Sequence, residues 1–524
     1  MGPANKFNLG YFFSRVNSPL CNIDPENTAV KYLDKSLSYR ELNKQINKVA
    51  NGLLSIGAKK RFKTCLLAYN CIEFFEIFYA VAKIGGIFIP LNFRLVAEEL
   101  KHIINHSEAE AIIYGPEFKG VIDEIRSDLK YTKKYICLEE DRLANDDIYS
   151  EIINYQSDHE PKIDYDVLQN DLQMIMYTSG TTGLPKGVMF THSQLLWSAA
   201  SQSIAFSYNS KDVTLLTGPL YHVGALVDLS IGTTNMGGTN VIFPSLRMEI
   251  EDMLETMETN NVTNLLLFPI MVIRMLNLPG ISRFKLKSLR FAIVGGERIE
   301  AHLLQGIQDK WPWVKLYQAY GLTEGSEFTS LLDANFAIKK VGSIGKAFYN
   351  VDIRIVDNDG KDVEVGEIGE IINRSPATRG GYWKDPEATS KTFADGWCHT
   401  GDLGRIDHDG FLYIAGRKKE MIRSAGENIY ASEVESAIMK RPEIFEVAVY
   451  PVPHPLYTEA VMAAVVLKKG AKISKEELLE HCKKYLASYK KPKYIDFIDS
   501  LPRTASNKVK KFILQKKYED IALR

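Results

Sequence analysis

The sequence predicts an α/β protein. We expect a large N-terminal domain with doubly wound, mainly parallel sheets and a small β-rich subdomain, followed by a small α+β C-terminal domain. Over the first 120 residues, apolar strand segments alternate with amphipathic helix patterns, which is typical of βαβ units in a parallel sheet covered on both faces. Near residue 350 the pattern changes to short alternating strands and turns. From about residue 420, two helix patterns mix with two strand patterns over the length of a small domain.

The first helix is expected directly after Ser38. Ser38 and Glu41 have the spacing of a capping box, apolar residues at helical spacing follow, and Gly57 is a stop signal. The next elements are a strand at Cys65–Tyr69, a helix led by Asn70 and ending near Gly85, a strand at Ile87–Pro90, a helix through Ile103 and a strand at Ala111–Tyr114.

Three later apolar strands each run into a glycine-rich or polar turn. They are Met174–Thr178, Phe291–Val294 and Leu316–Tyr320. Ligands of open α/β sheets gather at the carboxyl ends of the strands. We therefore expect these three turns to line one crevice.

The remaining elements belong to the β-rich subdomain and to the last segment of the chain. Strands are expected at Val351–Val356, Gly369–Ile372, Phe411–Ile414, Glu446–Val452 and Val461–Leu467, and helices at Ala431–Lys440 and Ser474–Tyr485. No low-complexity linker separates these segments, so the joint between domains is expected to be a short hinge.

Composition excludes several classes of protein. A chain of 524 residues is too long for one ordinary core, and its 45% hydrophobic and 25% charged residues argue against disorder, collagen and coiled coil. The 64 basic and 65 acidic residues leave a net charge of −1, so no nucleic-acid partner is expected. Residues 483–517 carry a local excess of basic residues, as a nucleic-acid patch would. A domain that binds a nucleotide needs positive charge as well, which explains the excess without a nucleic-acid partner.

The cysteines and the apolar runs point to the cytoplasm. The six cysteines are scattered without a CxxC pair, which favours a reducing compartment and no structural zinc. No signal peptide is expected, and the most apolar stretch, Phe74–Pro90, contains Glu76 and Lys83 and is too short to span a bilayer. The aromatic run Phe74–Tyr79 indicates the buried face of a helix, with peripheral membrane contact as the alternative.

The strongest chemical signal is the run from Tyr177 to Gly187, which reads YTSGTTGLPKG. Its hydroxyls and its lysine offer donors to phosphate oxygens, and its glycines let the backbone approach closely. It is not a Walker A loop, because Pro185 and Gly187 flank Lys186 where that motif needs glycine and serine or threonine. On composition alone, a flexible surface loop is an equally good interpretation.

The full string resembles the phosphate loop of the adenylate-forming superfamily, which includes acyl-CoA synthetases, firefly-type luciferases and the adenylation domains of peptide synthetases. Further motifs of the superfamily follow in order over nearly the whole chain, and the pattern is most similar to bacterial fatty-acyl-CoA synthetases. The resemblance implies that ATP is bound by Thr178, Ser179, Gly180, Thr181, Thr182, Gly183, Lys186, Gly295, Gly296, Glu297, Tyr320, Gly321, Thr323, Asp402, Arg417 and Lys508.

The segment Tyr317–Glu324 resembles the second core motif of the superfamily. By this resemblance Tyr320 stacks on adenine and Thr323 contacts the phosphates. Glu324 holds Mg²⁺ together with Thr178, which fits the preference of this ion for carboxylates and phosphates. The turn Gly295-Gly296-Glu297 resembles the one that packs against the adenine and the acyl chain.

The resemblance also places a ribose site and a hinge. Asp402, in the segment Gly396–Asp402, matches the residue that binds both ribose hydroxyls, and two accepted O–H bonds suit a carboxylate. In the segment Gly416–Glu420, Arg417 would reach the ribose and Lys419 would be the pivot of the hinge. The implied division is an adenylation domain at residues 1–417 and a mobile domain at residues 418–524.

Two motifs of the C-terminal segment complete the resemblance. Ser424–Tyr430 is similar to the loop that forms one wall of the coenzyme A tunnel, through Gly426 and Glu427. Lys508 matches the lysine of the adenylation step, although Asn507 stands where relatives carry glycine. Asparagine tolerates a left-handed backbone, so the turn can be kept.

His222 lies in a segment, Pro219–Val223, that is similar to a motif in which a histidine or aromatic residue gates the carboxylate pocket. A buried structural histidine is the alternative. The expected lining of the acyl pocket is small and apolar without a fixed cation: His222, Val223, Gly224, Gly295, Gly296 and Gly321. The catalytic residues implied by the resemblance are Lys508, Glu324, Thr178 and His222.

The resemblance implies an ATP-dependent carboxylic acid–CoA ligase of the AMP-forming type, with ATP, Mg²⁺ and coenzyme A as cofactors. The expected acid is a medium- or long-chain fatty acid. The alternatives are an aryl acid similar to benzoate or coumarate, an acyl-AMP module that loads a carrier protein, and a luciferase-like oxygenase. Small molecules are the expected partners, and the choice between monomer and homodimer stays open.

Overall fold

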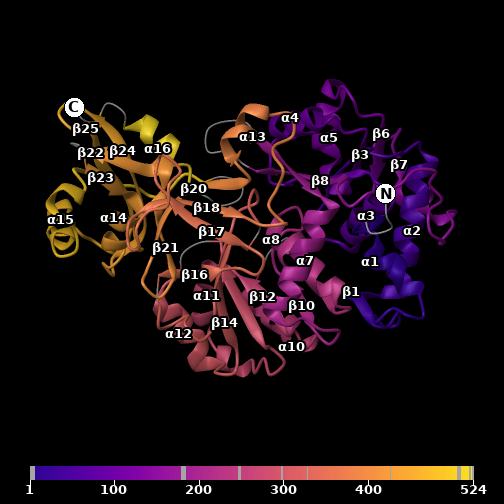
Figure 1. The fold of residues 1–524 in the computed structure, drawn as a ribbon, viewed down its shortest axis with the longest axis horizontal. Helices are drawn as coiled ribbons and strands as arrows, with labels where there is room; N and C mark the ends of the chain where they lie inside the picture. The colour runs from indigo at the N-terminus through magenta and orange to yellow at the C-terminus, as the bar shows by residue number, and fades with distance from the viewer. Residues whose placement is uncertain are drawn as a thin grey trace. The chain divides into compact units, whose positions relative to one another are not determined.

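The computed structural model describes residues 6–178, 185–245, 249–296, 299–326, 328–340, 342–424, 427–503, 509–518 and 521. The chain forms two compact units (Figure 1). The first consists of Met1–Ile353 and Asn373–His399, and the second of Arg354–Ile372 and Thr400–Arg524. The mixed α/β class with a large N-terminal and a smaller C-terminal part is confirmed. The division at residues 417/418 concerns a movable joint, which these units do not test, so it stays a prediction.

A seven-stranded sheet occupies the N-terminal part of the first unit, in the order β7-β6-β5-β3-β4-β8-β9. All its pairings are parallel except that of β8 with β9. Its strands are β3 (Lys63–Leu67), β4 (Ile87–Pro90), β5 (Ala111–Tyr114), β6 (Lys134–Cys137), β7 (Asp147–Ile148), β8 (Leu172–Thr178) and β9 (Lys186–Thr191).

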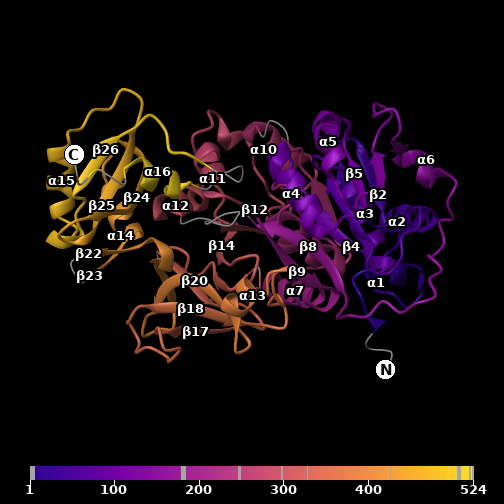
Figure 2. The same cartoon turned by 90° about the horizontal axis from the view of Figure 1, so that it is seen from above.

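Helices cover both faces of this sheet, as expected (Figure 2). Successive strand residues point to opposite faces. Leu66 and Phe88 therefore pack in the cluster that contains α2 (Tyr39–Ser55) and α3 (Ile72–Lys83), while Cys65 and Ile87 pack with α4 (Ala97–Ser107) and α5 (Lys119–Ile125). The short helices α1 (Tyr11–Ser14) and α6 (Tyr149–Asn154) complete this part.

A second sheet of the first unit runs in the order β15-β14-β13-β12-β10-β11-β1-β2, and it is parallel from β1 to β14. Its strands are β1 (Thr28–Tyr32), β2 (Lys35–Ser38), β10 (Val213–Leu216), β11 (Thr239–Ile242), β12 (Asn264–Leu267), β13 (Phe291–Gly295), β14 (Lys315–Tyr320) and β15 (Ser330–Leu332), with β16 (Ser343–Ala347) beside β15.

One face of the second sheet packs against α10 (Ile250–Thr259), α11 (Pro269–Leu276) and α12 (Ala301–Lys310). The other face packs against α7 (His192–Phe206) and α9 (Ile231–Asn235). This last cluster also contains Phe88 and Met174 of the seven-stranded sheet beside Leu266 and Ile293 of the second sheet. The two sheets therefore share one apolar layer.

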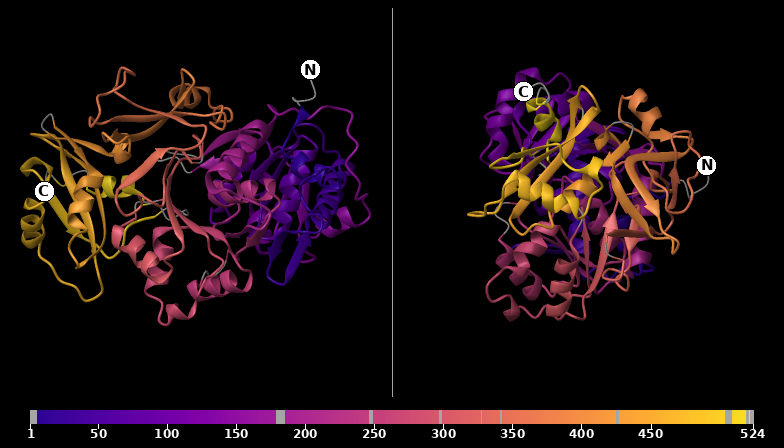
Figure 3. Two further views of the ribbon diagram at one scale, coloured as in Figure 1. Left: turned by 60° about the horizontal axis from the view of Figure 1, so that its bottom comes forward. Right: turned by 90° about the vertical axis from the view of Figure 1, so that its left-hand side faces the viewer.

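The second unit contains a C-terminal sheet in the order β23-β22-β25-β24, with β26 beside β25 (Figure 3). Its one face packs against α14 (Ala431–Ile438) and α15 (Lys475–Lys483), and the other against α16 (Lys511–Lys517). The strands are β22 (Met421–Ser424), β23 (Glu427–Tyr430), β24 (Ile444–His454), β25 (Thr458–Leu467) and β26 (Tyr494–Phe497). The α+β character predicted for this segment is confirmed.

A β-rich segment, most of which belongs to the second unit, comprises β17 (Asp352–Val356), β18 (Gly369–Arg374), β20 (Trp397–Ile406) and β21 (Leu412–Arg417), which are neighbours in this order. The helix α13 (Pro386–Thr392) and the strand β19 (Phe393–Ala394) precede β20. Among the described residues, no helix has the length and apolar character needed to cross a membrane.

Two predictions of local structure have opposite outcomes. The capping box is confirmed: the Ser38 amide donates to Glu41 Oε2 at 2.8 Å, and the Glu41 amide donates to Ser38 Oγ at 3.2 Å. The prediction that Asn70 leads the next helix is wrong, because Cys71 is the residue before α3 and the Asn70 side chain binds elsewhere in the unit.

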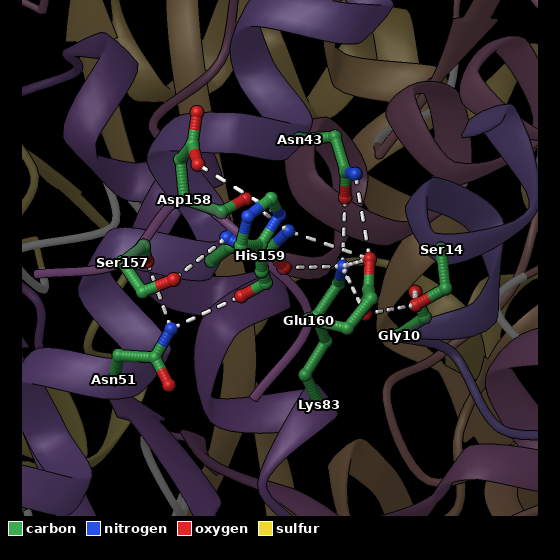
Figure 4. Close-up of polar contacts among 10 residues, drawn as sticks. Gly10, Ser14, Asn43, Asn51, Lys83, Ser157, Asp158, His159 and Glu160 are labelled. Carbon is green, nitrogen blue, oxygen red and sulfur yellow. Dashed lines mark hydrogen bonds and ion pairs between the residues drawn. The ribbon is translucent and has the colours of Figure 1, made fainter. Parts of the chain in front are cut away.

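A buried lysine ties several elements of the first unit together (Figure 4). Lys83, the last residue of α3, has a side chain that is only 2% exposed. Its Nζ donates to Oδ1 of Asn43 and of Asn47 on α2 and to Glu160 Oε1, each at 2.7 Å. Ser14 of α1 donates to Glu160 Oε2 at 2.8 Å. Burial lowers the pKa of Lys83 to about 8, while the charge of Glu160 acts to raise it.

Replacing Glu160 by glutamine tests this ion pair. Glu160→Gln keeps an acceptor for Lys83 but removes its counter-ion, so we expect stability to fall by about 2 kcal/mol, less than for a fully buried pair because Glu160 is partly exposed. The midpoint of urea unfolding measures the effect. The control is Glu387→Gln, which breaks an exposed pair with Lys391 at 2.6 Å and should leave the midpoint unchanged. Equal midpoints for both variants would contradict the assignment.

Candidate active site

The carboxylate of Glu324 is the meeting point of three segments of the first unit. Glu324 follows the end of β14 at Tyr320, and its Oε1 accepts hydrogen bonds from Thr178 Oγ1 at 3.5 Å and from the Tyr382 hydroxyl at 3.0 Å. Thr178 is the last residue of β8, in the other sheet. The ends of β8 and β14 therefore lie together, as predicted for the crevice.

Tyr382 is a site residue that the sequence analysis missed. Burial and the negative charge of Glu324 hold the pKa of Tyr382 well above its usual range. The phenol therefore stays protonated and donates to the carboxylate at neutral pH. A tyrosine after two glycines carries no chemical signal by itself, and its partner lies 58 residues away in the chain.

Lys186 supplies positive charge on the same side of the unit. It is the first residue of β9, and the register of the β8–β9 pair places it opposite Thr178. Its Nζ lies 3.9 Å from Asp385 Oδ2 and 5.1 Å from the centroid of the Tyr382 ring. A lysine over an aromatic face is attracted by the ring quadrupole, so Lys186 is held beside Tyr382, whose hydroxyl binds Glu324.

The predicted turn after β13 lies beside β14. Gly295 pairs with Ala319 in the parallel register of these strands. Gly296 has a φ of +85°, and a β-carbon there would lie 2.9 Å from a ring carbon of Phe268. Glycine is therefore required at residue 296 by both its backbone and its neighbour. Tyr320 and Thr323 are half-buried and Gly321 is exposed, and their roles toward ATP stay predictions.

His222 is exposed and is not the buried structural histidine of the alternative interpretation. It precedes α8 (Val223–Ala225), and its Nδ1 accepts a hydrogen bond from the Gly224 amide at 3.1 Å. Because Nδ1 is the acceptor, the neutral ring carries its proton on Nε2. Val223 and Gly224 of the predicted acyl lining are buried beside it.

Asn70 positions the loop that carries His222. It is buried, and its Nδ2 donates to the carbonyl oxygens of Gly218 and Phe243, each at 3.0 Å. Its Oδ1 accepts from the Leu220 amide at 2.8 Å. One side chain thus satisfies three backbone groups around the loop between β10 and α8, which fixes the chain just before His222.

The predicted ribose residues lie in the second unit and contact each other. Arg417 Nε lies 2.8 Å from Asp402 Oδ1, and the two residues are register partners on β20 and β21. The Asp402 side chain is 7% exposed and that of Arg417 is 51% exposed. Lys419, the predicted pivot, is exposed in a short 3₁₀ helix, Lys418–Glu420.

Several predicted residues cannot be placed. Glu427 begins β23, and only its backbone is described. Outside the described residues lie Ser179, Gly180, Thr181, Thr182, Gly183, Glu297, Gly426 and Lys508. The functions predicted for these residues stay predictions.

The donor set of the first unit fits Mg²⁺ in the presence of a nucleotide. A threonine hydroxyl and a carboxylate lie within hydrogen-bond distance at Thr178 and Glu324, and hard oxygen ligands of this kind suit the ion. Among the side chains that the structure describes, no group of three or more His, Cys, Asp or Glu residues could hold a metal.

Comparison with known proteins defines the class. The AMP-binding enzyme family matches residues 21–383, and the C-terminal domain of AMP-binding enzymes matches residues 433–508. The chain therefore belongs to the AMP-binding enzyme family of the adenylate-forming superfamily. Within it, the protein is an acid–thiol ligase of the AMP-forming acyl-CoA synthetase type, with ATP, Mg²⁺ and coenzyme A as its cofactors.

The curated relatives differ in the acid that they are named for. The chain is 33% identical over 496 residues to a feruloyl-CoA synthase of Amycolatopsis sp. The matched region covers 95% of this chain and 97% of the relative. It is also 33% identical to the indoleacetate–CoA ligase of Aromatoleum aromaticum and to the long-chain-fatty-acid–CoA ligase FadD13 of Mycobacterium tuberculosis, each over 93% of this chain and 94% of the relative.

Solved structures share the fold over almost the whole chain. The anthranilate CoA ligase AuaEII in complex with anthranoyl-AMP has a TM-score of 0.88 at 25% identity, covering 99% of both chains. The o-succinylbenzoate CoA synthetase MenE of Bacillus subtilis in complex with ATP and magnesium has a TM-score of 0.84 at 28% identity, covering 98% of this chain and 99% of that one.

Removing the Tyr382 hydroxyl tests the Glu324 site. Tyr382→Phe keeps the ring but removes a hydrogen bond to a charged group, which is worth about 1.5–3 kcal/mol. We expect kcat/KM for acid-dependent AMP formation to fall roughly tenfold or more. The matched control is Tyr149→Phe, which removes the buried hydrogen bond of 2.7 Å from the Tyr149 hydroxyl to Glu76. The assignment is wrong if both variants lose the same activity at equal folded fraction.

Proposed function

We propose that the protein joins a carboxylic acid to coenzyme A in two half-reactions at the site around Glu324. In the first, a carboxylate oxygen attacks the α-phosphorus of ATP, and the bond to pyrophosphate breaks to leave acyl-AMP. In the second, the sulfur of coenzyme A attacks the acyl carbonyl, and AMP leaves with the electrons of the broken C–O bond. The observation that carries the proposal is the convergence of Thr178 and Tyr382 on one carboxylate.

The first half-reaction brings two anions together, so its barrier is largely electrostatic. Mg²⁺ held by Glu324 and Thr178 would supply positive charge beside the phosphates. Tyr382 orients the carboxylate of Glu324, and Lys186 adds a cation on the same side. Lys508 is proposed to direct a further cation at the α-phosphate.

The second half-reaction needs a different surface of the C-terminal segment. We propose that residues 418–524 rotate against residues 1–417 about Lys419. The movement would withdraw Lys508 and bring the loop with Gly426 and Glu427 to the acyl-AMP. Asp402 and Arg417, which already contact each other, are proposed to hold the ribose during both steps.

Two classes of acid are candidates for the substrate. A medium- or long-chain fatty acid has support from the similarity to FadD13. An aryl or arylalkyl acid has support from the similarity to the relatives named feruloyl-CoA synthase and indoleacetate–CoA ligase. The sequence identity to each of these three relatives is 33%, so sequence similarity does not separate fatty acids from aryl and arylalkyl acids. A cytoplasmic location is part of the proposal, since the six free cysteines suit a reducing compartment.

A panel of carboxylic acids tests the activity itself. We expect ATP- and acid-dependent AMP release that requires coenzyme A for turnover, with at least one fatty or aryl acid active. Pyrophosphate exchange without coenzyme A should mark the same acids. AMP release that needs a carrier protein, or light or CO₂ formed with oxygen, would replace the ligase by one of the alternative functions.

Two substitutions separate the half-reactions. Lys508→Ala should lower acyl-AMP formation by about 10²–10³-fold, the loss typical for one well-placed charged donor, yet spare thioester formation from supplied acyl-AMP. Gly426→Leu should block the path of the thiol and show the reverse pattern. Pyrophosphate exchange and thioester formation measure the two steps. Equal losses in both steps for both variants would argue against the alternating domain.

A further inference from the structure

A buried carboxylate lies next to the segment that carries His222. Directly after α8 the chain forms one π-helical turn, Leu226–Ser230, a conformation that is rare and is frequently found at functional sites. It contains Asp228, which is 8% exposed, and whose Oδ1 has no hydrogen-bond partner within the part of the chain that the structure describes. A buried oxygen without a partner costs free energy, so it needs an explanation.

The geometry around Gly224 shows what Asp228 faces. A β-carbon placed on Gly224 would lie 3.4 Å from His222 Nδ1, 3.4 Å from Leu266 Cδ2 and 3.9 Å from Asp228 Oδ2. These are van der Waals distances, so the three side chains surround room for a carbon-sized group above Gly224. Leu266 also reaches toward Gly295, where a β-carbon would lie 3.8 Å from its Cδ1. Asp228 therefore borders the predicted acyl lining.

Arg379 is a buried cation whose charge acts on Asp228. It is 2% exposed, its guanidinium carbon lies 4.0 Å from the centroid of the Phe190 ring, and it donates to the Ala377 carbonyl. Burial raises the pKa of Asp228 to about 7, and the positive charge of Arg379 acts to lower it. The predicted apolar lining of the acyl pocket is therefore bordered by a buried aspartate, on which the charge of a buried arginine acts.

We propose that Asp228 is a specificity residue of the acid site: it accepts a hydrogen bond from an N–H or O–H group of the substrate. This rests on the proposed ligase function. The preferred acids would carry a neutral donor away from the carboxylate, such as a phenolic hydroxyl or an indole N–H. A second carboxylate on the acid would be repelled by Asp228. Because Arg379 already balances the charge, a neutral donor fits better than an ammonium group.

A site that hydrogen-bonds its substrate discriminates strongly, since an analogue without the donor leaves a buried polar group unpaired. Hydrocarbon acids would fill the same space without donating a hydrogen bond to the Asp228 carboxylate. The inference therefore favours the donor-bearing members of the aryl and arylalkyl class over a fatty acid.

Matched acids that differ in one donor test the proposal. The pairs are 4-hydroxycinnamate with cinnamate and indole-3-acetate with naphthalene-1-acetate, and decanoate is the aliphatic reference. Acid-dependent AMP release gives kcat/KM for each. We expect the wild-type protein to prefer the donor-bearing member of at least one pair by about tenfold or more, as for a lost hydrogen bond to a charged group.

Variants assign the preference to Asp228. The ratio of kcat/KM between the two acids of the pair that shows a preference should fall close to one in Asp228→Leu. Asp228→Asn, which keeps an acceptor of the same shape, should retain part of the preference. Since Asp228→Leu leaves Arg379 buried without its counter-ion, Asp228→Leu/Arg379→Met is measured as well. The matched control is Asp146→Asn, which alters another buried aspartate that binds Arg126 at 2.6 Å and should leave the ratio unchanged.

The outcomes are distinguishable. An active enzyme without a donor preference, or variants that lower both members of a pair equally, would overturn the role of Asp228 and leave the ligase function standing. A protein that activates no acid of the wider panel would overturn the proposed function and this inference with it.

Discussion

The site depends on the orientation of one carboxylate. Glu324 Oε1 accepts hydrogen bonds from a hydroxyl at the end of β8 and from a phenol that follows β18 in the chain. Two donors to one oxygen hold the carboxylate in place and fix the direction of the remaining oxygen. The strands β8 and β14, which belong to different sheets, must therefore end close to each other at Glu324. The packing of the first unit keeps these two ends together.

Apolar packing and a few polar contacts meet this requirement together. The shared layer between the two sheets sets the distance between β8 and β14, because side chains from both fill it. Asn70 fixes the loop before His222, and Lys83 joins α2 and α3 to the segment around Glu160. These buried polar groups are fully used, so they select one arrangement where apolar contacts alone would tolerate several.

The local elements could be predicted because their signals are local. The strands Ile87–Pro90 and Ala111–Tyr114 have the predicted bounds, and the capping box of Ser38 and Glu41 forms as expected. The prediction that Asn70 leads a helix was wrong. An asparagine just before a helix looks like a cap in the sequence, even where its side chain binds the backbone of a distant loop, as it does here. Tyr382 and Asp228 were missed for the same reason. Their importance lies in partners on other segments, Glu324 and Arg379, and in burial, which no spacing in the sequence reports.

The apolar layer common to both sheets also bears on how the first unit folds. The cluster contains side chains of α2 and α3 from the first half of the unit and of α7 and α9 from the second half, so each half buries apolar side chains against the other. Cutting the chain between the two sheets would expose apolar side chains of this cluster to water on both fragments. The N-terminal half of the unit, which leaves the ribosome first, therefore keeps part of its apolar surface exposed until the later half folds against it.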